Sequence, residues 1–144
     1  MRVAKASALG GVVETRAGGK MFTGTVWAEV LLPNEKGAGL NRVTFAPGAR
    51  TWWHRHEGGQ MLIGEAGRGL VVTRSGDVTA IGDGIVVHGC PNEEHWHGAM
   101  PDAFMTHLSC VLVGETEFLE EVSEPDYLAA VERTRANLSV LDRL

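Results

Sequence analysis

The chain has 144 residues, of which 44% are hydrophobic and 22% charged, and its formal net charge is −5 at pH 7. This length suits one well-buried core and is short for two, so we expect a single domain over residues 1–144. The acidic balance and the lack of a dense Lys/Arg stripe argue against nucleic acid or an anionic membrane as the main partner, which leaves a small-molecule substrate.

The cellular compartment can be predicted from two further features. No apolar run approaches the roughly 20 residues of a membrane span, and the start lacks the pattern of a signal peptide. The only cysteines, Cys90 and Cys110, are too few for a disulfide framework. We expect a cytoplasmic protein with reduced thiols, in which a metal-ligand role for Cys90 is a weak alternative.

The first 56 residues predict an arm followed by strands. Residues 1–20 lack sustained periodicity and are expected to form an arm or a short edge strand. The β-branched and aromatic residues of 21–32 predict a strand, ended by Pro33-Asn34 and a loop at 37–39. Residues 40–45 alternate as a second strand, after which Pro47-Gly48 turns the chain into a strand over 51–56.

Short strands separated by turn residues continue to residue 122. They are expected at 60–63, 69–74, 78–81, 84–88, 95–97 and 103–113, with a last edge strand at 117–122. This succession of short strands and turns is typical of a jelly roll or barrel, so an all-β barrel is predicted over 21–122.

A helix is predicted over 123–144. Ser123 is placed to cap it, and Pro125 is tolerated in a first turn. An apolar stripe is expected from Leu128, Val131, Leu138 and Leu141. The stripe is expected to pack on the protein's own barrel, with a second subunit as the alternative.

The candidate site lies in residues 48–67. Side chains alternate faces on a strand, so His54 and His56 point the same way. Gly58-Gly59 can reverse the chain into a second strand, and this hairpin geometry brings Gln60 toward the two histidines. The three side chains can then bind one metal ion. The alternative is that the two histidines are merely exposed on a strand.

These residues resemble the first motif of the cupins: Gly48, five residues, His54-Arg55-His56, three residues, Gln60, six residues, Gly67. Residues 82–98 are similar to a loosened second motif. The resemblance implies a cupin jelly-roll fold and makes His95 the fourth metal ligand.

A narrower resemblance links residues 21–122 to the small bacterial cupins that include manganese-dependent hydroxynitrile lyases. It rests on the segments 22–26, 43–51, 95–99 and 105–108. In that group the ligands match His54, His56, Gln60 and His95, and a pocket histidine corresponding to His107 is implicated in acid-base chemistry. Residues 57–58, His88, Cys90 and the C-terminal helix depart from the group, which leaves the substrate open.

One divalent ion per subunit is therefore expected. The resemblance implies Mn or Fe, and imidazole and amide ligands also suit Zn, Ni or Co. Cupins commonly carry Glu where this chain has Gln60, and a neutral ligand leaves the site with one more positive charge. The alternative is that Gln60 marks a degraded site.

Strand alternation predicts where the remaining histidines lie. His97 shares a face with His95 and is expected to line the pocket. His107 shares a face with Met105, Ser109 and Val111, where its unperturbed pKa near working pH suits a general acid or base. The alternative for His107 is a hydrogen-bonded core histidine, and His88 is expected to be structural.

Three functions are compatible with such a site. The first is a metal-dependent lyase acting on a small hydroxyl or carbonyl compound, with the metal as Lewis acid and His107 or His97 moving the proton. The second is a dioxygenase using Fe or Mn, and the third is a non-catalytic small-molecule binding protein. Family likeness, the arm and the helix favour a homodimer or homotetramer.

Overall fold

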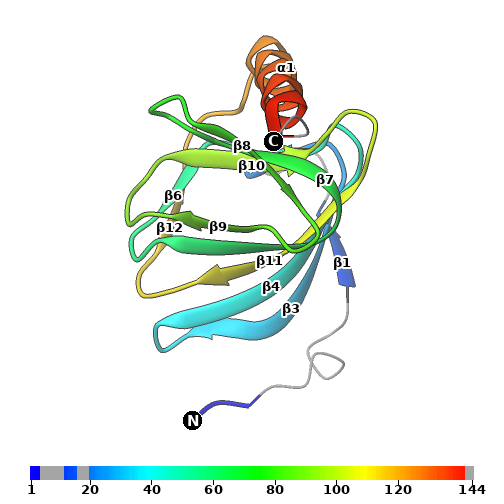
Figure 1. The fold of residues 1–144 in the computed structure, drawn as a ribbon. Helices are drawn as coiled ribbons and strands as arrows, with labels where there is room; N and C mark the ends of the chain where they lie inside the picture. The colour runs from blue at the N-terminus through cyan, green and yellow to red at the C-terminus, as the bar shows by residue number, and fades with distance from the viewer. Residues whose placement is uncertain (4–11, 16–19, 142–144) are drawn as a thin grey trace.

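The computed structural model describes residues 1–3, 12–15 and 20–141 and confirms an all-β barrel with a C-terminal helix on its outside (Figure 1). All strand pairs are antiparallel, and the path β1-β3-β4-β11-β7-β10-β5-β2 rolls up into the barrel. The elements are β1 (Val12–Thr15), β2 (Phe22–Thr23), β3 (Val26–Glu35), β4 (Ala38–Phe45), β5 (Arg50–Thr51), β6 (His54–His56), β7 (Gln60–Thr73), β8 (Val78–Gly82), β9 (Val86–Gly89), β10 (His95–Ala99), β11 (Met105–Val111), β12 (Thr116–Phe118) and α1 (Glu124–Leu141).

The N-terminal strands agree with the prediction in part. Strand β1, paired with β3, is the short edge strand expected as one alternative for residues 1–20, whereas residues 4–11 and 16–19 lie outside the described part. The strand expected over 21–32 divides between β2 and β3, and β3 continues through Pro33. Pro33 is tolerated because it lies in an irregular part of the β3–β4 ladder, beyond the reach of β1. The turn is Lys36-Gly37, whose φ angles of 49° and 88° suit a tight hairpin.

The strand predicted to carry the first ligands is also divided. Residues 52–53 separate β5 from β6, and β6 pairs with β10 and β12. Gly58-Gly59 does form a turn, with Gly59 N donating to His56 O at 3.1 Å. The predicted β6–β7 hairpin is wrong, because both neighbours of β6 come from later in the chain.

Strand β7 is one 14-residue strand where two were expected. Its register with β11 shifts between Thr106 and His107, which is the mark of a bulge. Gly67 bends the strand with a φ of 74°, and a Cβ there would lie 2.0 Å from Phe104 O. As a result β7 supplies Gln60 at one end of the barrel and core residues at the other.

Two apolar clusters divide the molecule. The first fills one end of the barrel interior and contains Val26, Phe45, Leu62, Val71, Ile81 and Met105 among its members. The second lies between the barrel and α1 and includes Leu70, Trp96, Met100, Tyr127 and Val131. The buried histidines lie against the first cluster, since the rings of His97 and His107 pack on Phe45.

Helix α1 begins as predicted and packs on its own barrel. Ser123 Oγ accepts a hydrogen bond from Asp126 N at 3.2 Å, which is an N-cap. The predicted stripe is wrong in part: Val131 is buried, but Leu128 and Leu138 are 47% and 37% exposed, and the side chain of Leu141 lies outside the described part. The buried face is instead formed by Tyr127, Ala130, Val131 and Thr134.

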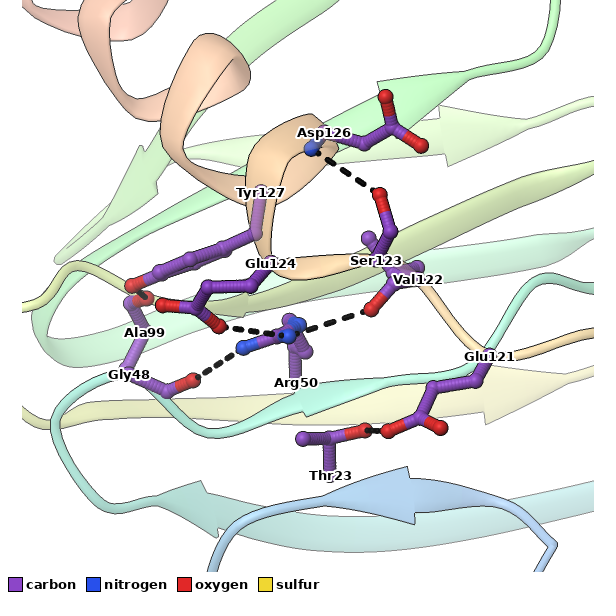
Figure 2. A network of polar contacts seen from close by, with 10 residues as sticks. All are labelled: Thr23, Gly48, Arg50, Ala99, Glu121, Val122, Ser123, Glu124, Asp126 and Tyr127. Atoms are coloured by element: carbon purple, nitrogen blue, oxygen red, sulfur yellow. Dashed lines mark hydrogen bonds and ion pairs between the residues drawn. The ribbon is translucent and has the colours of Figure 1, made fainter.

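Arg50 fastens the start of this helix to the barrel (Figure 2). Its guanidinium donates to Val122 O at 3.1 Å and to Glu124 Oε2 at 3.0 Å, and it lies 4.5 Å from the centre of the Tyr127 ring. The Tyr127 hydroxyl donates to Ala99 O at 2.8 Å. Within the described residues, no helix combines the length and hydropathy needed to cross a bilayer.

Candidate metal centre

The structure brings the four predicted ligands together from three strands. His54 and His56 lie on β6, Gln60 begins β7, and His95 begins β10 directly opposite His54. The ring centres of His54 and His95 are 4.4 Å apart, and that of His56 is 5.0 and 5.6 Å from them. All four side chains are buried.

Each of these imidazoles is held through Nδ1. His54 Nδ1 donates to Trp52 O and His95 Nδ1 donates to Glu93 O, both at 2.9 Å, while His56 Nδ1 lies 2.8 Å from Thr116 Oγ1. Histidines that bind metals are commonly oriented in this way, with the second ring nitrogen left for the ion. His56 Nε2 is buried without a hydrogen-bond partner in the described structure.

Burial keeps these rings neutral. It lowers the pKa of His54 and His95, and it lowers the pKa of His56 to about 4. A neutral imidazole offers a lone pair on Nε2 once Nδ1 carries the proton. The rings therefore present lone pairs in the protonation state that a metal ion requires.

Gln60 completes the donor set. Its Nε2 donates to Ser109 Oγ at 2.8 Å, which turns Oε1 toward His95 Nε2, also at 2.8 Å. With Nδ1 protonated, His95 Nε2 is an acceptor, so two acceptors face each other in a buried space. A cation that both atoms can bind would relieve this repulsion, and the residues present therefore fit a divalent ion of the transition series.

His97 lies closer to this group than the sequence indicated. Nitrogens of His54, His95 and His97 lie within 4.8 Å of one another. That geometric group contains His97 in place of His56, and His97 Nε2 is also buried without a partner in the described residues. Cys90 is outside this group and exposed. That His56 is a ligand and His97 is not thus stays a prediction.

His107 is paired with His97. Its Nε2 lies 3.0 Å from His97 Nδ1, and its ring packs against Phe45. The expectation of an unperturbed pKa is wrong, because complete burial lowers the pKa of His107 to about 4. At neutral pH His107 is uncharged, so in the resting protein it can accept a proton.

A cavity of about 210 Å³ lies beside these rings, and we name it the substrate cavity. His54, His56, Gln60, His97 and His107 line it. The other walls are mainly apolar or uncharged and include Phe22, Asn41, Val43, Phe45, Val111 and Phe118. An apolar cavity with a few convergent polar groups suits a small, largely apolar molecule.

A second cavity of about 230 Å³ reaches the centre from another direction, and we name it the side cavity. It is lined by Gln60 and His95 together with Asp77, His88, Cys90 and Glu93. His88 and Cys90 are exposed at its outer part.

A larger concavity, of about 660 Å³, lies between β8 and α1, away from the histidines. Its lining includes Ile81, Met100 and Leu138 with Arg68 and Arg135 but no histidine or cysteine. Size alone would place the site there, but the chemistry places it at the histidine cluster.

Three residues of the centre were missed by sequence reasoning. Thr116 orients His56, Ser109 orients Gln60, and Phe118 stacks on His54 with ring centres 5.1 Å apart. They lie about 50 to 60 residues from their partners and reach them through strand pairing. No local motif in the sequence signals these contacts.

Comparison with known proteins adds family relationships. The profile of the family described as "Cupin domain" matches residues 41–112. A curated protein of Granulicella tundricola, described as (R)-mandelonitrile lyase, is 42% identical over 124 residues, which cover 80% of this chain and 95% of that protein.

Solved structures agree with this. A cupin-like protein from Thermotoga maritima is 37% identical with a TM-score of 0.77, covering 82% of this chain and 93% of its own. A predicted oxalate decarboxylase from the same organism has a TM-score of 0.66 at 20% identity, covering 78% of this chain and 100% of its own, which is a likeness of fold alone.

Proposed function

Because this chain belongs to the cupin family, we propose that it is a metal-dependent lyase that cleaves or forms small α-hydroxynitriles. The observation that carries the proposal is the convergence of three imidazoles, each held through Nδ1, beside a cavity that also contains the buried His97–His107 pair. The relative described as (R)-mandelonitrile lyase supports this reaction class.

In this proposal His54, His56, Gln60 and His95 hold one divalent ion per subunit, with Mn or Fe expected. When bound, the ion supplies Lewis acidity toward the oxygen of the substrate. All four donors are neutral, so the protein leaves the charge of the ion uncompensated.

The histidine pair provides the proton transfers. In cleavage, His107 accepts the hydroxyl proton, and the electron pair of that O–H bond becomes the second carbon–oxygen bond. The carbon–cyanide bond breaks with its electrons on cyanide, which takes the proton from the histidine pair and leaves as hydrogen cyanide beside the carbonyl product.

His97 positions this base. With His107 Nε2–H donating to His97 Nδ1 at 3.0 Å, the other ring nitrogen of His107 is left as an acceptor. The phenyl rings of Phe22, Phe45 and Phe118 along the cavity keep bulk water away from the transfer and suit an aromatic or aliphatic substituent.

Elemental analysis of the purified protein, paired with mandelonitrile cleavage followed by benzaldehyde absorbance, tests the proposal. His56→Ala should abolish stoichiometric metal, and full retention would contradict the ligand assignment. His107→Ala should keep metal content and folding while lowering turnover roughly 10²- to 10⁴-fold, the range for losing a positioned proton-transfer group.

The exposed His88 provides the matched control, since His88→Ala removes an imidazole outside the substrate cavity. Unchanged turnover in His107→Ala would make His107 a core residue and His97 the next candidate. Oxygen consumption by an iron-loaded protein would favour the dioxygenase, and metal binding without turnover would favour the binding protein.

A further inference from the structure

The candidate metal centre lies between two cavities of similar size. Gln60 lines both the substrate cavity and the side cavity, and His95 lines the side cavity. An ion held by these residues would therefore be reachable from two directions.

The side cavity opens where the barrel wall is incomplete. Strand β7 pairs with β8 through residues 68–72 and with β9 through residues 60–63, and the described ladders contain no β8–β9 pairing. A Cβ at Gly89 would be in van der Waals contact with His95 Cε1, at 3.6 Å, so the absence of a side chain leaves space beside this ring.

The two cavities differ in charge. The side cavity is lined by the carboxylates of Asp77 and Glu93 together with His88 and Cys90, all residue types that bind divalent cations. The described lining of the substrate cavity contains no Asp, Glu, Lys or Arg, and burial keeps its histidines neutral. Glu93 lies next to the inner end, since His95 Nδ1 donates to its backbone carbonyl at 2.9 Å.

We propose that the side cavity is the inlet through which a divalent metal ion reaches the centre, separate from the route of the organic substrate. The inference rests on the metal centre of the proposed function and extends it to the loading of that centre. Carboxylates beside a low-dielectric channel raise the local concentration of a cation and hence its rate of arrival.

Metal-free protein mixed rapidly with Co²⁺ tests this, because cobalt uptake is followed by its absorbance without any assay of activity. Asp77→Asn/Glu93→Gln should slow uptake at low ionic strength by roughly tenfold, within the range that electrostatic steering supplies. The difference should shrink at high salt, where exposed charges are screened, while the final stoichiometry stays the same.

Glu132→Gln/Asp126→Asn is the matched control, because it removes the same charge from exposed positions on α1. Equal uptake rates for both double variants and the unmodified protein would overturn the inlet while leaving the metal centre intact. Failure of the unmodified protein to take up Co²⁺ would instead overturn the proposed metal centre itself.

A second measurement does not depend on the folding of these variants. Alkylation of exposed Cys90 with a bulky maleimide should slow both Co²⁺ uptake and removal of the ion by a chelator. Protein loaded before alkylation should keep its turnover of mandelonitrile, and Cys90→Ser should be insensitive to the reagent. Unchanged exchange rates after complete alkylation, or loss of turnover in the preloaded protein, would contradict separate routes.

Discussion

Acid should unfold the metal-free protein at a pH where ordinary proteins remain stable, because its buried imidazoles must stay neutral. Burial lowers the pKa of both His56 and His107 to about 4, whereas an unfolded histidine has a pKa of about 6.5. Between these values the unfolded chain binds more protons than the folded one, so the free energy of unfolding falls as pH falls from 6.5 to 4.

The magnitude follows from these pKa values. At pH 5 each of the two histidines should lower the free energy of unfolding by about 2 kcal/mol, or about 4 kcal/mol together. The pKa values of His54, His95 and His97 are shifted in the same direction and steepen the loss. A domain of ordinary stability has only about 5–15 kcal/mol to lose.

Urea unfolding of the metal-free protein, followed by tryptophan fluorescence at pH 7.5, 6 and 5, measures this loss. His107→Gln removes one titrating ring and should reduce the loss between pH 7.5 and 5 by about 2 kcal/mol. His88→Gln, at an exposed position, should leave it unchanged. A flat free energy of unfolding between pH 6.5 and 4.5, or the same loss in His107→Gln, would refute the reasoning.

Three further predictions concern other contacts. Thr116→Val should weaken metal affinity about 10- to 100-fold in calorimetry, since it removes the hydroxyl that orients His56; an unchanged affinity would argue for the ligand set with His97. Tyr127→Phe should lower the free energy of unfolding by about 1 kcal/mol in urea, because the buried Ala99 carbonyl loses its bond from the hydroxyl. Light scattering at micromolar concentration should give a homodimer or homotetramer, and a monomer would count against it.

Most of the correct predictions rest on the alternation of side chains between the two faces of a single strand. It placed His54 and His56 on one face, and it put His107 and Ser109 inside the barrel while Leu108 and Cys110 are less buried. These relations depend only on the geometry of a strand, so the sequence suffices to predict them.

Two predictions failed because partners distant in the chain decide the outcome. The β6–β7 hairpin was inferred from Gly58-Gly59, but β12 competes successfully for β6. The lowered pKa of His107 comes from complete burial, which is a property of the closed barrel that no local pattern expresses.

The helix stripe failed for a different reason. Choosing the largest aliphatic side chains selected Leu128 and Leu138, but the face that docks is set by Tyr127 at the helix start. Tyr127 packs on Trp96 and against Arg50, and its neighbours Ala130 and Val131 follow at helical spacing. Which face of α1 is buried thus depends more on how the helix start docks on the barrel than on the hydrophobicity of its side chains.

The pairing of β6 with β12 determines when during synthesis the metal centre can form. His54 and His56 leave the ribosome about 60 residues before Phe118 and Thr116, the residues that support their rings. Ser109, which sets the orientation of Gln60, also follows its partner by 49 residues. Contacts of such long sequence separation form late in folding, so a nascent chain exposes two histidines without the geometry that selects an ion. The candidate metal centre is therefore complete only once nearly the whole barrel sequence has been synthesised.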